Sequence, residues 1–174
     1  YTLVDGGRTA DITRASVTVT TSDVVKTYNG TLGVAGATTA PVAIVLAGSN
    51  TQMFGSDTLS GGSYAFTDAN AGSSDRTVTV AGVTVNDGNG GNNYAVTYAS
   101  NTTSTINPYA VTVTALSQTK AYDSNTSVAD TTRYSVGTMV GSESLSGVTL
   151  AYADANVSRD GSGTVLSDKT IAVS

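Results

Sequence analysis

Two lysines in matching sequence contexts are the residues with the clearest potential for chemistry. Lys26 precedes the run Tyr28-Asn29-Gly30, and Lys120 precedes Tyr122-Asp123-Ser124. A buried lysine amine beside an Asn or Asp side chain, with a carboxylate catalyst, can form an intramolecular isopeptide bond. The alternative is a lysine whose aliphatic stem covers the nearby tyrosine while its ammonium reaches water. The low carboxylate count, 13 Asp and Glu among 174 residues, favours this alternative.

A glycine-rich loop is the second candidate site. Residues 87–93 read Asp-Gly-Asn-Gly-Gly-Asn-Asn, and Asp87, Asn89 and Asn92 supply oxygen atoms of the kind that calcium loops use. The loop holds one carboxylate, and the Gly-x-Asp nonapeptides of calcium β-rolls are missing. A tight turn with Asn in left-handed geometry is therefore the favoured interpretation, and we expect no other cofactor.

Composition and charge exclude several functional classes. The chain has no His and no Cys, so it lacks the usual imidazole bases, thiolate nucleophiles and zinc ligands, and we expect no enzymatic activity. Eight scattered Lys and Arg in a chain of net charge −5 form no footprint for nucleic acid. The longest apolar run, residues 41–47, is far shorter than the roughly twenty residues of a membrane helix, so we expect no membrane insertion.

The segments that must position these sites alternate with a period of two. Apolar residues alternate with Thr, Ser or Ala, and clusters of Gly, Asn, Asp and Ser separate the alternating runs. This pattern predicts an all-β chain of half-buried antiparallel strands. We expect Tyr28 and Tyr122 in equivalent settings. The predicted core residues are Val17, Val19, Val78, Val80, Val111, Val113, Ile171 and Val173.

An internal repeat organises the strands. The matched blocks are residues 26–28 with 120–122, 68–70 with 154–156, and 76–78 with 169–171. Their offsets are 94 (120 − 26), 86 (154 − 68) and 93 (169 − 76), so the length differences fall in loops. The blocks at 68–70 and 154–156 both read Asp-Ala-Asn, whose short polar side chains are expected to cap backbone turns.

The repeat register predicts three parts. Residues 1–4 match residues 94–97 and the match continues through Ile12 and Ile106, so residues 1–14 would be the tail strand of a preceding repeat. Residues 15–107 would be one complete immunoglobulin-like repeat, and residues 108–174 a second repeat whose C-terminal strands are missing. Pro108, at the junction, restricts its own φ and that of Asn107, which predicts a short stiff linker and an elongated array.

The mismatch between the two ends predicts head-to-tail assembly. Residues 1–14 of one molecule would supply the strand that residues 110–174 of the next molecule lack. Such a contact is heterologous and would propagate as a fibre. In a longer chain, residues following Ser174 would make the same pairing.

The order of the motifs resembles a known family. A Lys-x-Tyr-(Asn/Asp)-(Gly/Ser) turn, a Leu-Ser-Gly block, an aromatic-x-Asp-x-Asn block, a basic-Thr-Val/Ile strand and a Gly-Asn-Asn-Tyr strand are similar to YDG-type repeats, which are related to the mostly bacterial Ig-like (MBG) domains of large surface adhesins. The two turns read Tyr-Asn-Gly and Tyr-Asp-Ser. The resemblance implies tandem antiparallel β-sandwiches in a secreted or cell-surface, filamentous-haemagglutinin-like biofilm adhesin.

Two functional hypotheses follow. In the first, the chain is a structural repeat of an adhesin stalk or extracellular fibre, and its partners are neighbouring repeats or identical subunits. In the second, it binds a carbohydrate or another ligand, such as extracellular polysaccharide or a host surface, through tyrosines or the inserted loop at residues 47–56. A binder should cluster its tyrosines in a concave site, whereas a spacer should distribute them.

Overall fold

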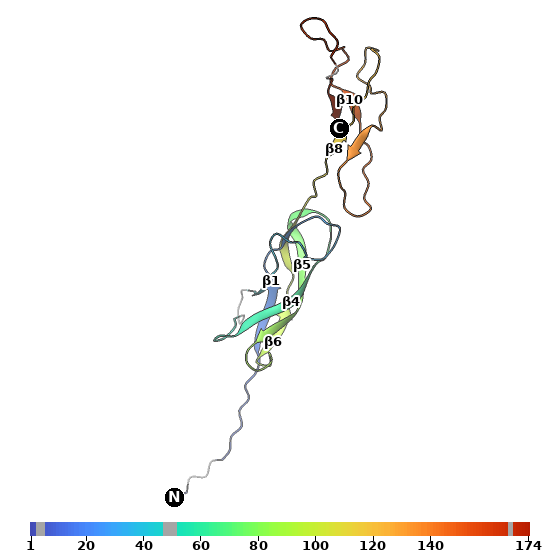
Figure 1. Ribbon diagram of the computed structural model, residues 1–174. Coiled ribbons are helices and arrows are strands. Elements are labelled where there is room, and N and C mark those ends of the chain that lie inside the picture. The colour runs from blue at the N-terminus through green and yellow to red at the C-terminus, as the bar shows by residue number, and fades with distance from the viewer. Residues whose placement is uncertain (3–5, 47–51, 167–168) are drawn as a thin grey trace. The chain divides into compact units, whose positions relative to one another are not determined.

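The computed structural model describes residues 1–2, 6–46, 52–166 and 169–174 (Figure 1). These residues form an all-β structure with several sheets, and no helix among them is long and apolar enough to cross a membrane. The chain divides into two compact units, unit 1 (Tyr1–Tyr109) and unit 2 (Ala110–Ser174). Part of the predicted tail strand (3–5) and the first half of the inserted loop (47–51) lie outside the described residues.

All strands of unit 2 have three residues, whereas unit 1 contains both three-residue strands and longer ones. Unit 1 contains β1 (Ala15–Thr21), β2 (Val25–Thr27), β3 (Ala43–Val45), β4 (Thr58–Phe66), β5 (Gly72–Asn86), β6 (Tyr94–Tyr98) and β7 (Asn101–Asn107). Unit 2 contains β8 (Val113–Ala115), β9 (Tyr134–Val136), β10 (Leu150–Tyr152) and β11 (Ile171–Val173). Their β-branched and aromatic residues suit a pleated, half-buried surface.

Unit 1 consists of a three-stranded sheet ordered β3-β1-β6 and a four-stranded sheet ordered β2-β7-β5-β4. The pairs β1/β3, β4/β5 and β5/β7 are antiparallel, as predicted. The pairs β1/β6 and β2/β7 are parallel, so the antiparallel prediction is wrong there. Parallel pairing needs a long crossover, and the whole unit lies between these first and last strands.

The chain passes from one sheet to the other between β1 and β2, and again between β6 and β7. Polar side chains join the two crossing segments at this step. Asn101 Nδ2 and Thr103 Oγ1 donate hydrogen bonds to Asp23 Oδ1 over 2.8 and 2.6 Å. These two bonds lower the pKa of Asp23. Ser104 Oγ, which is buried, accepts from Val24 N (3.0 Å) and donates to Asn101 Oδ1 (2.8 Å). Both strands are thereby held in register where backbone pairing is interrupted.

Two apolar clusters stabilise unit 1 and one stabilises unit 2. They are Val17, Val19, Val85 and Tyr94; Val24, Phe66, Val78 and Ile106; and Val128, Leu150 and Tyr152. Burial of Val17, Val19, Val78 and Val80 confirms the predicted core of unit 1. Each cluster excludes water from aliphatic and aromatic surface, which is the main stabilising term in a chain of this composition.

The predicted core of unit 2 is only partly correct. Val113, Ile171 and Val173 are half-buried, and Val111 is exposed. Tyr28 is half-buried whereas Tyr122 is 63% exposed, so their settings are not equivalent. In unit 1, β6 and β7 cover the corresponding positions, and no strand of the described part of unit 2 lies in their place.

The strand pairs of unit 2 nevertheless repeat the registers of unit 1. The β8/β9 pair sets Val113 opposite Val136, as β1/β3 sets Val19 opposite Val45. The β10/β11 pair runs from Leu150 to Tyr152 against Val173 to Ile171. In unit 1 the corresponding residues 64–66 of β4 pair with residues 80–78 of β5. The sequence offsets therefore coincide with matching backbone geometry.

Truncation of valines at matched positions should change the free energy of unfolding of the two units by different amounts. Val17→Ala removes buried methyl groups from the cluster with Val85 and Tyr94 and is expected to lower the free energy of unfolding of unit 1 by about 1–3 kcal/mol. Val111→Ala, at the matched exposed position, should lower that of unit 2 by less than about 1 kcal/mol. Urea denaturation followed by circular dichroism measures both. Equal losses would contradict the difference in burial between Val17 and Val111.

Candidate functional site

Lys26 lies at the centre of a hydrogen-bonded turn. Its residue surface is 1% exposed, and its Nζ donates to Asn29 Oδ1 (3.0 Å), Thr31 O (2.5 Å) and Gly33 O (2.9 Å). The ammonium also lies 5.0 Å from the centroid of the Phe66 ring, within cation–π distance. All these partners are neutral, and removal from water lowers the pKa of Lys26.

Local sequence explains why three oxygen atoms converge on this ammonium. Asn29 Oδ1 also accepts from the backbone N and the Oγ1 of Thr31 (3.2 and 2.9 Å), which closes an Asx turn. Gly30 has φ of 72°, in the left-handed region that glycine adopts at little cost. The chain therefore reverses tightly and directs the carbonyls of Thr31 and Gly33 inward.

Lys120 forms the equivalent turn in unit 2. Its Nζ donates to Asp123 Oδ1 (2.5 Å) and to Asn125 O (2.7 Å) and Oδ1 (3.0 Å), and it lies 5.7 Å from the Tyr152 ring centroid. The hydrogen bond from Lys120 lowers the pKa of Asp123. Ser124 takes the place of Gly30 and has φ of 59°, which a residue with a side chain adopts only with strain.

These geometries bear on the two interpretations of the lysines. Lys26 is buried and its ammonium is enclosed by protein oxygens, so a stem with a solvated head group is the wrong description. Nζ touches Asn29, but the described ion pairs do not include Lys26, and its acceptors are neutral. The isopeptide hypothesis for Lys26 and Lys120 stays a prediction. Intact-mass spectrometry tests it, because each such bond to an Asn releases one ammonia.

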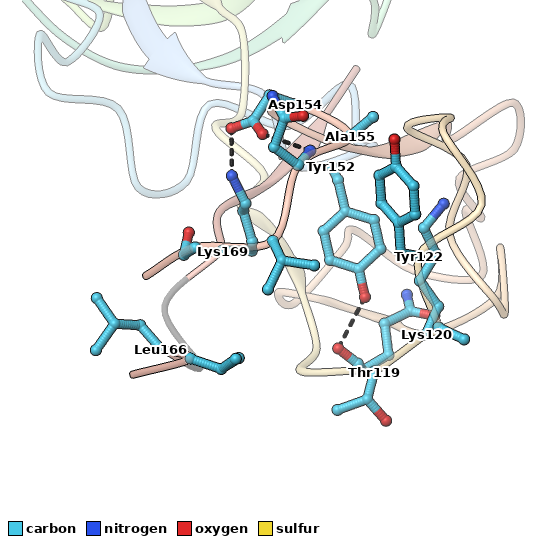
Figure 2. Close-up of a pocket in the computed structure, with 14 residues that line it drawn as sticks. Thr119, Lys120, Tyr122, Tyr152, Asp154, Ala155, Leu166 and Lys169 are labelled. Carbon is cyan, nitrogen blue, oxygen red and sulfur yellow. Dashed lines mark hydrogen bonds and ion pairs between the residues drawn. The ribbon is translucent and has the colours of Figure 1, made fainter. Parts of the chain in front are cut away.

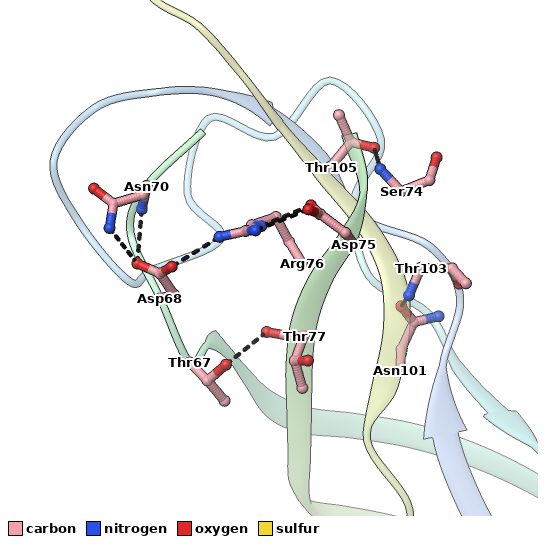
Figure 3. A network of polar contacts seen from close by, with 10 residues as sticks. All are labelled: Thr67, Asp68, Asn70, Ser74, Asp75, Arg76, Thr77, Asn101, Thr103 and Thr105. Carbon is pink, nitrogen blue, oxygen red and sulfur yellow. Dashed lines mark hydrogen bonds and ion pairs between the residues drawn. The ribbon is translucent and has the colours of Figure 1, made fainter. Parts of the chain in front are cut away.

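The two Asp-Ala-Asn blocks cap turns, as predicted, and each also forms an ion pair. Asp68 Oδ1 accepts from Asn70 N (3.0 Å), while Oδ2 accepts from Arg76 Nη1 at 2.7 Å (Figure 3). Arg76 Nε also bonds Asp75 at 2.8 Å. In unit 2, Asp154 Oδ1 accepts from Asn156 N, and Asp154 Oδ2 pairs with Lys169. The sequence alignment matched Arg76 with Lys169 without indicating these partners.

The candidate calcium loop satisfies its own polar groups. Asp87 Oδ1 accepts from Asn89 N and Gly91 N (both 2.8 Å), and Oδ2 accepts from Asn93 N (3.1 Å). These backbone donors, that of Gly91 first, lower the pKa of Asp87. Asn92 Nδ2 donates to Asn89 O (2.7 Å). Within the described residues no cluster of three or more acidic, His or Cys side chains could hold a metal, and calcium binding here stays a prediction.

A cavity of about 300 Å³ opens in unit 2 beside the Lys120 turn (Figure 2). Two tyrosines line it, Tyr122 and Tyr152, and Tyr152 Oη donates to Gln118 O (2.9 Å). Lys120 and Lys169 contribute the cationic part of its wall. No sequence pattern indicated this cavity, because its walls combine residues 118–122 with residues 152–158, which lie about thirty residues further along the chain.

Comparison with known proteins identifies the larger unit. A family model described as the YDG domain matches residues 13–104, which is more than half of the chain. The chain belongs to the YDG-domain family. The comparisons with curated proteins and with solved structures found no significant match.

The two lysine turns differ at the two positions that follow the tyrosine. Asn29 and Gly30 in unit 1 correspond to Asp123 and Ser124 in unit 2. In each turn the Asn or Asp side chain accepts from the lysine and from a backbone amide, and the next residue has left-handed φ. Tyr28 packs against the Phe66 cluster, whereas Tyr122 is 63% exposed.

Replacing Lys26 tests how much its ammonium contributes to the free energy of unfolding. Lys26→Met keeps a similar apolar stem but removes the ammonium that donates to the carbonyl oxygens of Thr31 and Gly33, so we expect unit 1 to lose about 2–4 kcal/mol of unfolding free energy. Lys169→Met removes only an ion pair near the surface and should cost less than about 1 kcal/mol. Denaturation of both variants in urea checks the difference. A near-neutral Lys26→Met would refute the role assigned to the turn.

Reciprocal substitutions should test the left-handed position. Ser124→Gly relieves strain and is expected to stabilise unit 2 by about 1 kcal/mol, whereas Gly30→Ser introduces strain and should destabilise unit 1 by a similar amount. Thermal unfolding of each unit reports both changes. Shifts of the same sign would show that side-chain contacts, and not backbone φ, determine the preference.

Proposed function

We propose that the chain is a load-bearing part of a bacterial adhesin stalk or extracellular fibre, secreted or displayed at the cell surface. In this proposal immunoglobulin-like sandwiches follow one another in an elongated array, and adhesion to a target lies elsewhere in the assembly. The role is structural and not catalytic. Membership of the YDG-domain family and the recurrence of the same strand registers in both units support it.

The observation that carries the proposal is the parallel pairing of the two strands that begin unit 1, β1 and β2, with the two strands that end it, β6 and β7. Backbone hydrogen bonds join them from Ala15 N to Asn93 O (2.9 Å), through Ala99 N to Val19 O (2.9 Å). The last is Tyr28 N to Asn107 O (2.8 Å). Because the strands are parallel, tension applied at residues 14 and 107 pulls them in opposite directions along their axes. All the bonds are then loaded in shear together, and none can break alone.

The cavity of unit 2 favours a second candidate function, the binding of an oligosaccharide. Tyr122 and Tyr152 lie in a concave site with lysines at its edge, which is the arrangement expected of a binder. Titration with soluble oligosaccharides, with Tyr122→Ala as the control, tests this candidate. The corresponding place in unit 1 is filled by Ile106, so binding would be confined to unit 2.

Mechanical anisotropy tests the stalk proposal. The chain has no Cys, so cysteines introduced at Arg14 and Asn107 provide unique handles for single-molecule pulling. We expect unit 1 to rupture at a clearly higher force through this pair than through handles at Arg14 and Asn93, where the bonds would open one after another. Forced unfolding reports the unfolding barrier directly.

Equal rupture forces in the two geometries would remove the mechanical basis of the proposal. The cellular part is tested separately with antibodies raised against the chain. They are expected to label intact cells of the source organism, or material that these cells release. Labelling that needs cell lysis would contradict a surface location.

A further inference from the structure

We propose that Asn29 is a site of self-catalysed deamidation, at which the Lys26 turn converts the asparagine into an aspartate. Water is the co-substrate and ammonia is the released product. This inference goes beyond the stalk proposal and does not depend on it, because it concerns a covalent change inside unit 1 of the purified chain.

The sequence supplies the reacting pair. Asn29 is followed by Gly30, and both residues are exposed. In such a pair the backbone nitrogen of the second residue can attack the side-chain amide carbon of the first, and glycine has no side chain to hinder the approach. Asn29 Oδ1 accepts from Thr31 N, and the ring that this hydrogen bond closes contains the nitrogen of Gly30. Gly30 N donates to none of the described residues, so the attacking atom is open to solvent.

The carbonyl oxygen of the Asn29 side chain is held by three donors. They are Lys26 Nζ at 3.0 Å, Thr31 N at 3.2 Å and Thr31 Oγ1 at 2.9 Å. Attack on the amide carbon moves negative charge onto this oxygen, and donors that already point at it stabilise the transition state as an oxyanion hole does. One of them is the ammonium of a buried lysine, whose interaction is strengthened where protein replaces water. Asn29 Nδ2 donates to none of the described residues, so the leaving nitrogen can take a proton from water.

The reaction has two steps. Gly30 N loses its proton to solvent and bonds to Asn29 Cγ, the Cγ–Nδ2 bond breaks, and the protonated leaving group departs as ammonia from a cyclic imide. Water then adds to Cγ, the bond from Cγ to Gly30 N breaks, and that nitrogen regains a proton. The net change is the gain of one water and the loss of one ammonia. Because the same donors hold the oxygen on Cγ in both steps, the ring opens at Cγ and gives aspartate in place of isoaspartate.

The Lys120 turn shows the arrangement that the product would have. Asp123 occupies the place of Asn29 and accepts from Lys120 Nζ at 2.5 Å. Asp123 Oδ1 also accepts from a turn amide, as Asn29 Oδ1 does. Deamidation would therefore give the buried ammonium of Lys26 an anionic partner, in a turn whose counterpart already holds one.

A second Asn-Gly pair provides a matched comparison inside unit 1. Asn89 and Gly90 are also exposed, and Gly90 has φ of 65° against 72° for Gly30. Asn89 Oδ1 accepts from none of the described residues, whereas Asn89 Nδ2 donates to Asn93 Oδ1 at 3.0 Å. The dipeptide sequence alone would make the two sites equally reactive, so a faster reaction at Asn29 would come from its surroundings.

Peptide mapping by mass spectrometry measures both sites in the full chain. Each conversion replaces an amide NH2 by OH, which changes the mass of the peptide, and fragmentation distinguishes aspartate from isoaspartate. During incubation near neutral pH, the folded chain should convert Asn29 at least about ten times faster than Asn89, and mainly to aspartate. In concentrated urea, where the turn is lost, the two rates should become similar.

Removal of one donor tests the assigned role of the turn. Thr31→Val keeps the shape of the side chain but removes the hydroxyl that donates to Asn29, so it should slow conversion of Asn29 about tenfold or more and leave that of Asn89 unchanged. Thr38→Val is the matched control, because the Thr38 hydroxyl donates to Val25 O (3.1 Å) and to neither asparagine. It should leave both rates unchanged.

Three results would overturn the inference. They are slower conversion of Asn29 in the folded chain than in urea, equal rates at Asn29 and Asn89 in the folded chain, and equal effects of Thr31→Val and Thr38→Val. Loss of ammonia without gain of water, persisting after mild alkaline treatment that hydrolyses the cyclic imide, would also overturn it and identify an isopeptide bond from Lys26. These measurements are independent of the rupture forces of unit 1, so failure here and failure of the stalk proposal are distinguishable.

Discussion

The enclosure of a lysine ammonium is the constraint on which the turn and the packing around it depend. Transfer of a charge from water into protein is costly unless its hydrogen bonds are replaced. For Lys26 the replacement consists of an amide oxygen, two carbonyls and the face of Phe66. These groups come from the turn that follows β2 and from the end of β4. One side chain therefore joins a local turn to a strand forty residues away.

The two lysine turns show how the partners of the ammonium differ with the burial of the lysine. Lys26 is buried and has neutral partners, so its charge is stabilised by dipoles and by an aromatic ring. Lys120 is less enclosed and pairs with Asp123, which balances its charge. Phe66 beside the first lysine is replaced by Tyr152, whose hydroxyl bonds a backbone carbonyl. The difference follows the presence of β7 in one unit and the open cavity in the other.

The parallel pairing of β6 and β7 with β1 and β2 connects the Lys26 turn with the resistance of unit 1 to tension. The last strand, β7, completes an apolar cluster through Ile106 and pairs with β2, which carries Lys26, while the preceding strand β6 pairs with β1 in the other sheet. A single segment thus provides burial, strand pairing and the load path between the two ends of the unit.

The sequence by itself determined the features that depend on near neighbours. Alternation marked Val17 and Val19 as buried strand residues, and turn chemistry placed a structured turn after each lysine, because both signals extend over only a few residues. The repeat also placed the two lysines in equivalent turns. Only the tertiary structure decided that the Lys26 ammonium points inward and that β1 and β6 run parallel. Those outcomes depend on partners forty to eighty residues away, whose approach no local pattern encodes.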